Sequence, residues 1–161
     1  MATLRRNGKR GAAVWMTIDS GATGVTLPAT TYHSLGLDLL RDVRIRTEDA
    51  RGHVLTRDAG LVPDLVLGPL VVNEVITAVG GEQHVLGQSI LSHTPWEIDW
   101  DRGKLTLGAA PWADQPTVVS LPLRREGDSE VVTVDLGGVP VDLVVDTGAF
   151  ASTLPESVGA S

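Results

Sequence analysis

Two aspartates stand in nearly the same sequence surroundings, far apart along the chain. In each copy an apolar, strand-like run leads into one Asp, then a small hydroxyl residue, then Gly-Ala, and Thr-Leu-Pro follows a few residues later. The matching residues are Asp19, Ser20, Gly21 and Ala22 in the first copy and Asp146, Thr147, Gly148 and Ala149 in the second. A carboxylate presented twice in one local frame indicates a site built from two equivalent halves.

The chemistry available to such a pair follows from its charge. Two carboxylates held face to face cannot both ionise easily, so they share one proton and their pKa values separate. The pair can then deprotonate a trapped water while it protonates a carbonyl oxygen, which is general acid–base hydrolysis without a covalent intermediate. The glycine in each motif permits a sharp turn and close approach, and the neighbouring hydroxyl can brace a facing loop.

Length and composition are those of an ordinary globular protein. The 161 residues can bury one core or two small lobes, and 42% hydrophobic with 20% charged residues argues against wholesale disorder. Cysteine is absent, which excludes disulfides and thiolate metal sites. No apolar run approaches the roughly 20 residues that span a bilayer, so we expect a soluble protein without a membrane span.

The charge pattern argues against nucleic-acid binding. Net charge is −7, and four of the 13 basic residues lie in the first ten positions. A nucleic-acid interface needs a basic face or stripe, and none follows this short arm, which we interpret as a solvated or frayed terminus. Only the short Ala12–Met16 run comes after it, which makes a poor secretory signal, and the compartment stays open.

Most of the chain reads as short β-strands separated by Gly, Pro, Asp or Asn. Strands are predicted at Val43–Thr47, Val54–Thr56, Leu61–Leu67, Leu70–Val79, Glu97–Trp100 and Lys104–Leu107, and then at Thr117–Leu123, Val131–Leu136 and Val139–Val145. Hairpin turns are predicted at Gly68-Pro69, Asp101-Arg102-Gly103 and Gly137-Gly138. Two short helices are predicted at Ala29–Leu35 and Gln88–His93.

The chain divides into two unequal units. Residues 1–110 form the first, the Pro- and Ala-rich residues 111–116 are a linker, and 117–161 begin the second. Only 15 residues follow Asp146, so the second unit is a stub. Either it is part of a longer two-unit protein or it completes a neighbouring copy of the fold, and the sequence leaves both open.

The two Asp motifs resemble the catalytic loops of retropepsin-like aspartic proteases. Three further segments extend the resemblance. Val85–Leu91 is similar to the family's second signature, an apolar pair followed by Gly and a short helix; Thr47–Thr56 stands where the family has its flap; and Trp96–Leu107 resembles the terminal hairpin of a bacterial lobe. The match covers residues 12–107 as a whole lobe and 117–161 as the opening third of another.

This resemblance implies an all-β fold of closed, barrel-like sheets with one or two short helices, and an aspartic endopeptidase activity. It implies catalytic roles for Asp19 and Asp146, bracing roles for the hydroxyls of Ser20 and Thr147, and turn roles for Gly21 and Gly148, with Ala22 and Ala149 completing the active-site loops. The flap tip is assigned to Asp49, Ala50, Arg51 and Gly52. The implied mechanism needs no cofactor and no metal.

The implied partner is a peptide or protein substrate. Because the second unit has no Leu-Gly segment, flap or terminal hairpin, a homodimer that pairs Asp19 with its symmetry mate is the simpler way to build the site. A pseudo-dimer that pairs Asp19 with Asp146 is the other arrangement.

Two other functions stay open. The same fold could serve as a non-catalytic module that binds peptides or assembles with other chains, because a fold can persist without activity. A sugar-kinase-like or actin-like ATPase also has phosphate loops that read apolar-Asp-x-Gly followed by Thr. That fold needs a longer chain with substantial helices, whereas the pattern here is rich in β-strands.

Overall fold

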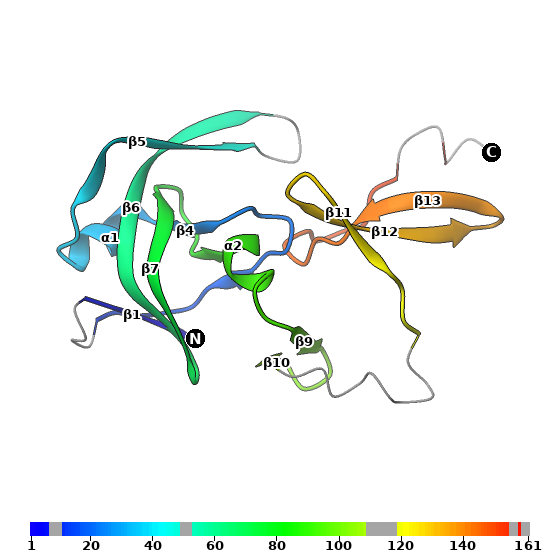
Figure 1. Ribbon diagram of the computed structural model, residues 1–161, viewed down its shortest axis with the longest axis horizontal. Helices are drawn as coiled ribbons and strands as arrows, with labels where there is room; N and C mark the ends of the chain where they lie inside the picture. Colours follow the sequence, from blue (N-terminus) through cyan, green and yellow to red (C-terminus); the bar gives the residue numbers. More distant parts are fainter. Residues whose placement is uncertain (7–10, 49–52, 109–118, 155–157, 159–161) are drawn as a thin grey trace.

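A mixed β-sheet forms the main body of the chain in the computed structural model (Figure 1), which describes residues 1–6, 11–48, 53–108, 119–154 and 158. Within these residues the sheet has eight strands in the order β2-β1-β6-β7-β4-β8-β3, and β5 pairs with β6. The strands are β1 (Ala2–Arg5), β2 (Ala13–Val14), β3 (Thr17–Ile18), β4 (Val25–Leu27), β5 (Leu39–Glu48), β6 (Val54–Leu67), β7 (Leu70–Val79) and β8 (Val85–Leu86). The predicted all-β fold with short helices is confirmed.

The long hairpin β6–β7 lies in the middle of this sheet. It closes at the predicted Gly68-Pro69 turn, where Leu67 pairs with Leu70 and Gly68 has a φ of 59°. Such a left-handed conformation is open to glycine at little cost. The sequence predicted two strands where the structure has the single strand β6, because Gly60 resembles a strand breaker; Pro63 lay within the second predicted strand.

Both of those residues fit the continuous strand. Pro63 has no partner in the β6–β7 register, so its missing N–H removes no bond from that ladder. Gly60 lies under the ring of Tyr32, and a Cβ there would stand 2.4 Å from the Tyr32 Cζ. Tyr32 is fully buried and its hydroxyl accepts a hydrogen bond from the Leu61 N–H at 2.9 Å.

Two short helices cover the sheet at separate places. Helix α1 (Ala29–Ser34) begins where predicted, ends one residue early, and is followed by Gly36 with a φ of 63°. Helix α2 (Gln88–Leu91) is shorter than predicted and buries Ile90 and Leu91 in the core. No helix in the described part of the chain is long and apolar enough to cross a membrane.

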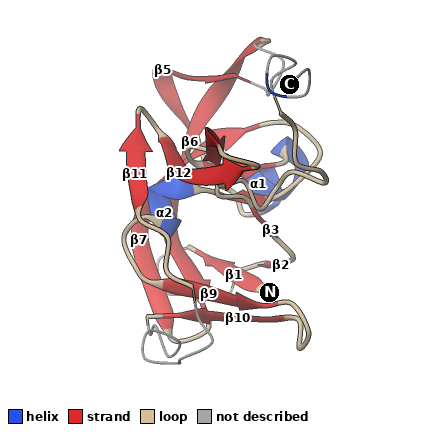
Figure 2. Cartoon of the chain, turned by 90° about the vertical axis from the view of Figure 1, so that its right-hand side faces the viewer, coloured by secondary structure: helices blue, strands red, loops and turns tan. Residues whose placement is uncertain are grey.

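A small hairpin, β9 (Trp96–Asp99) and β10 (Lys104–Leu107), lies at the end of the molecule opposite the β5–β6 hairpin (Figures 1 and 2). Its turn includes the predicted Gly103, with a φ of 57°. Trp96 and Leu107 pack against the main core, so this hairpin closes the lower side of the sheet.

Residues 119–154 contain a separate three-stranded antiparallel sheet of β11 (Leu123–Glu126), β12 (Ser129–Leu136) and β13 (Val139–Val144). The predicted turn at Gly137-Gly138 joins β12 to β13. The predicted strand Thr117–Leu123 is wrong over residues 119–122, which form no strand, while 117–118 and the linker 111–116 lie outside the described residues. The division into two units stays a prediction.

The N-terminal strand β1 corrects the interpretation of this region as a frayed arm. Ala2 and Leu4 are 2% and 0% exposed, and β1 pairs with both β6 and β2. The basic residues misled the sequence argument, because burial here depends on alternation: Ala2 and Leu4 face the core while Thr3 and Arg5 do not.

The chain offers an internal comparison for β1. The residues Leu-Arg-Arg occur both at 4–6 and at 123–125, where they begin β11. Strand β1 has the neighbour β6 to cover it, whereas β11 pairs with β12 alone among the described strands. Leu123 is accordingly 57% exposed.

This contrast makes a stability prediction. We expect Leu4→Ala to lower the free energy of unfolding by about 2–5 kcal/mol, because it removes buried methyl groups and leaves a cavity. Its matched control Leu123→Ala should change that free energy by less than about 1 kcal/mol, since this side chain is already exposed. Urea denaturation of the three proteins measures both values. Equal effects, or a small effect at Leu4, would restore the frayed-arm interpretation.

Candidate active site

Asp19 is placed by the parallel pairing of β3 with β8. Strand β3 ends at Ile18, and the next N–H, that of Asp19, donates to the Leu86 carbonyl at 3.0 Å. The Asp19 Oδ1 then accepts hydrogen bonds from the Gly21 N–H at 3.0 Å and the Ala22 N–H at 2.9 Å. The Asp19 carboxylate is therefore held by hydrogen bonds within its own loop, independently of Asp146.

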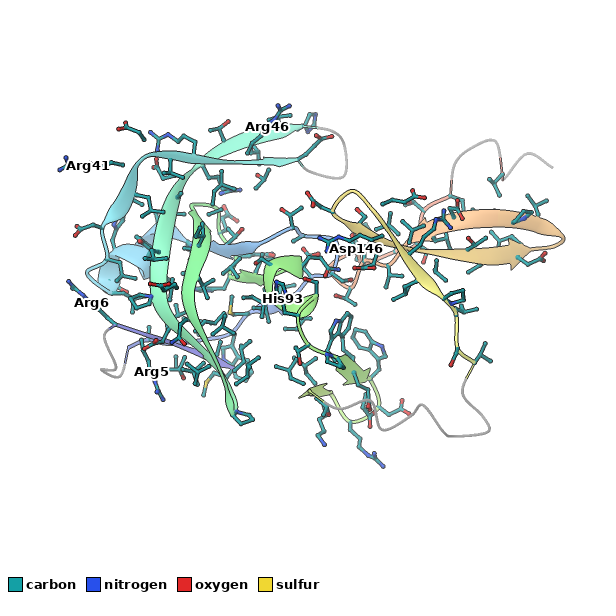
Figure 3. The ribbon with its side chains drawn as sticks, in the orientation of Figure 1. Arg5, Arg6, Arg41, Arg46, His93 and Asp146 are labelled. Atoms are coloured by element: carbon teal, nitrogen blue, oxygen red, sulfur yellow. The ribbon has the colours of Figure 1, made fainter. Side chains whose placement is uncertain are left out.

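Asp146 is held in the same way. It follows β13, the Val145 N–H donates to the Glu130 carbonyl at 2.9 Å, and the Asp146 Oδ1 accepts from the Gly148 N–H at 2.8 Å. Figure 3 shows Asp146 at the point where the second sheet meets the main body. The two motifs thus share a local geometry as well as a sequence.

The structure brings these two loops together within one chain. A Cβ built on Gly21 would lie 2.5 Å from the Asp146 Cγ, and one built on Gly148 would lie 2.4 Å from the Asp19 Cγ. Each carboxylate therefore occupies the space beside the other loop's glycine. This contact within one chain matches the pseudo-dimer arrangement at the two loops, and the homodimer that the sequence argument found simpler stays a prediction.

Both glycines lie in turns, and each also leaves space for the opposing loop. Neither Gly21 nor Gly148 has a positive φ, so a left-handed turn does not require them. The lack of space does require glycine, because any side chain at either position would overlap the opposing carboxylate. Glycine is needed here for the close approach of the two loops.

A reciprocal exchange of hydrogen bonds joins the loops. The Ser20 hydroxyl donates to the Val145 carbonyl at 2.7 Å and accepts from the Thr147 N–H at 3.0 Å. The Thr147 hydroxyl donates to the Ile18 carbonyl at 2.8 Å and accepts from the Ser20 N–H at 3.1 Å. Each hydroxyl uses its donor and its acceptor capacity on backbone groups of the other loop, so the two backbones are fixed relative to each other.

The segment around Gly87 supports the Asp19 loop from behind. The N–H groups of Gln88 and Ser89 donate to the carbonyls of Ala22 and Thr23 at 2.8 and 2.9 Å. A Cβ on Gly87 would lie 2.4 Å from the Ala22 carbonyl oxygen. This glycine lets α2 approach the loop closely enough to form those bonds.

Gln88 is a residue of the site that sequence reasoning missed. Its side chain is 4% exposed and its Nε2 donates to the Ser20 carbonyl at 3.0 Å. The available signal was a lone amide side chain within the otherwise apolar run Val85–Leu91, since buried polar groups are nearly always hydrogen-bonded.

The two carboxyl groups of the pair differ in how deeply they are buried. Burial raises the pKa of Asp19, the nearby charge of Asp146 and a hydrogen bond between the two side chains raise it further, and the Ala22 and Gly21 N–H groups partly oppose the rise. Asp19 is half-buried while Asp146 is exposed. Asp19 therefore keeps a proton to higher pH than an ordinary aspartate.

A cleft of about 1090 Å³ opens beside Asp19. Its walls are the Asp19 loop with the start of β4, the last residues of β5, and the loop after β7, and the turn between β11 and β12 adds Asp128 and Ser129. The sequence argument did not identify those two residues as part of the site. The predicted flap tip, Asp49, Ala50, Arg51 and Gly52, lies outside the described residues, although Thr47 and Glu48 next to it line the cleft.

No group of three or more metal-binding side chains gathers in the part of the chain that the structure describes. The groups that the site presents for chemistry are the two carboxyl groups and the backbone around them.

The reciprocal hydrogen bonds can be tested at Thr147. Thr147→Val keeps the shape but leaves the Ser20 N–H and the Ile18 carbonyl without their partner, so we expect a loss of about 1–3 kcal/mol in the free energy of unfolding. Thr147→Ser keeps the hydroxyl and should lose less than about 1 kcal/mol. Urea denaturation, with the amide NMR shift of Ser20 as a local probe, measures both. If the two variants behaved alike, the hydroxyl would not be what joins the loops.

Comparison with known proteins adds a family assignment. No curated protein and no solved structure matches the chain significantly. A family model described as "Aspartyl protease" matches residues 2–92, more than half of the chain and the part that contains Asp19, the β5–β6 hairpin and Gly87. The chain therefore belongs to the aspartyl protease family.

Proposed function

We propose that the protein is an endopeptidase in which Asp19 and Asp146 together activate water to hydrolyse a peptide bond. The observation that carries the proposal is the opposed pair itself: each carboxylate lies against the other loop's glycine, and two hydroxyls lock the loops together. Membership of the aspartyl protease family supports the same chemistry.

In the proposed mechanism the two carboxyl groups have different roles, one as the acid and the other as the base. Asp19, whose pKa is raised, holds the proton and donates it to the substrate carbonyl oxygen. Asp146 accepts a proton from the water as that water attacks the carbonyl carbon. The tetrahedral intermediate then collapses: the C–N bond breaks, the proton on Asp146 passes to the leaving amine, and one hydroxyl proton of the intermediate returns to Asp19 as the new carboxyl group forms.

The cleft provides the place for the peptide. It runs between the Asp19 loop and the β5–β6 hairpin, so a substrate bound there lies against Asp19 with the hairpin over it. We further propose that residues 1–110 act as one lobe and 117–161 as the start of a second, which contributes Asp146 and the cleft residues Asp128 and Ser129.

The proposal predicts that both aspartates are essential. Asp19→Asn or Asp146→Asn should lower kcat/KM for peptide cleavage by at least about 10²–10⁴-fold, the range for loss of general acid–base catalysis. Asp101→Asn, in the exposed β9–β10 turn, is the matched control and should retain activity. The measurement is cleavage of a mixed peptide library by the purified protein, followed by mass spectrometry.

Two compounds test the proposed chemistry further. A statine-type mimic of the tetrahedral intermediate should inhibit, and a chelator should not; chelator sensitivity would contradict the proposed mechanism. If the wild-type protein cleaves no peptide while Asp19→Asn still binds peptides, the alternative of a non-catalytic binding module is correct.

The raised pKa of Asp19 also makes a stability prediction. Between the ordinary aspartate pKa of 3.8 and the raised pKa, the folded state keeps a proton that the unfolded chain has lost, so the free energy of unfolding falls as pH rises through this window. Asp19→Asn cannot acquire that charge.

The variant should therefore be more stable than the wild type at about pH 7, and this advantage should vanish at about pH 3. Urea denaturation at both pH values measures it, with Asp101→Asn as control. An advantage of equal size at both pH values would mean that the effect does not come from the ionisation of Asp19.

A further inference from the structure

Arg57 occupies an unusual position in the cleft. It lies on β6 opposite Ile45 of β5, so its side chain leaves the hairpin on the same side as Ile45, and both residues line the cleft that contains Asp19. Arg57 is half-buried, whereas Arg46, which also lines the cleft from this hairpin (Figure 3), is exposed.

The loop after β7 makes room for the Arg57 guanidinium. A Cβ on Gly81 would lie 2.7 Å from the Arg57 Nη1, and one on Gly80 would lie 3.2 Å from the same atom. Gly80 has a φ of 131° and Gly81 a φ of 83°, values that other residues rarely adopt. The guanidinium is therefore seated on a Gly-Gly surface that side chains would block.

Within the described residues this guanidinium has no hydrogen-bond or ion-pair partner. Arg44, on the other face of the same hairpin, forms an ion pair with Asp58. Charged groups that leave water are normally paired, because desolvation without a partner is costly. A half-buried, unpaired guanidinium in the wall of the cleft is thus suited to a ligand that carries its counter-charge.

The other charges of the cleft limit where such a ligand can sit. Glu48, Glu82 and Asp128 also line it, as does Asp19, and none of them lies within ion-pair distance of Arg57. These acidic groups disfavour a uniformly acidic peptide. They are compatible with a single carboxylate placed at Arg57.

We propose that Arg57 binds a carboxylate of the peptide substrate, either an Asp or Glu side chain or the free C-terminus. Arg presents a planar fork of donors that matches a carboxylate with two parallel hydrogen bonds. The Gly80-Gly81 surface leaves the fork accessible from the cleft. This inference rests on the proposed peptidase function and gives its substrate class.

The test compares matched peptides from the cleaved library. At each position near the scissile bond, Glu is compared with Gln, and a free C-terminus with an amide; these two arms distinguish the sources of the carboxylate. We expect wild-type kcat/KM to be about 10-fold or more higher for one acidic member, chiefly through KM, since the carboxylate takes no part in the proton transfers proposed for the two aspartates.

Variants assign that preference to Arg57. Arg57→Gln should lower the ratio of kcat/KM between the acidic and the neutral member of each pair to about 1, and Arg57→Lys should retain part of that ratio. Arg44→Gln, on the opposite face of the hairpin, is the matched control and should keep the preference in full. A preference that survives Arg57→Gln in the folded protein would overturn the inference.

A binding measurement separates this inference from the proposed function. Fluorescently labelled Glu and Gln peptides, and free-acid and amide peptides, are titrated onto Asp19→Asn, with and without Arg57→Gln. An acid preference that depends on Arg57, together with no cleavage by the wild type, would refute the peptidase and uphold the carboxylate site. No acid preference by the wild type or by Asp19→Asn would overturn the carboxylate site whether or not peptides are cleaved.

Discussion

The exchange of hydrogen bonds between Ser20 and Thr147 is the constraint on which the rest of the site depends. Each hydroxyl bonds a carbonyl and an N–H of the opposite loop, so four backbone groups are satisfied by two small side chains. Because these bonds involve only the two loops, the small β11–β13 sheet presents Asp146 directly to the Asp19 loop. The same bonds determine how closely the two carboxyl groups approach.

That proximity has an energetic cost, which the surrounding structure offsets. Bringing Asp146 next to the half-buried Asp19 raises the Asp19 pKa and destabilises the ionised form. The N–H groups of Gly21 and Ala22 stabilise the Asp19 carboxylate locally, and Gln88 fixes the Ser20 carbonyl from behind. The raised pKa of Asp19 stands where we propose proton transfer, and Gln88, which supports its loop, lies in α2.

Local patterns in the sequence predicted what local physics determines. The Val-, Ile- and Leu-rich composition of Leu70–Val79 and the Gly68-Pro69 turn predicted the right strand and hairpin, because strand composition and turn chemistry act over a few residues. The burial of β1 was missed, since Leu4 becomes core only when β6 pairs beside it. The two Asp motifs were evident, but their meeting within one chain was not, because it depends on contacts between residues 127 positions apart. Gln88 was missed for the same reason.

The glycines of the site leave room for groups that come from other parts of the chain. Gly21 and Gly148 leave room for the opposing carboxylates, Gly87 for the approach of α2, and Gly81 for the Arg57 guanidinium. In each case the missing Cβ is filled by a polar or charged group from a distant part of the chain. A substitution at Gly21 or Gly148 would displace the opposing carboxylate, and one at Gly81 would displace Arg57 and also strain the backbone, whose φ there is 83°. The Gly-Asp contacts would then govern catalysis, and the Gly81–Arg57 contact would govern which peptides are chosen.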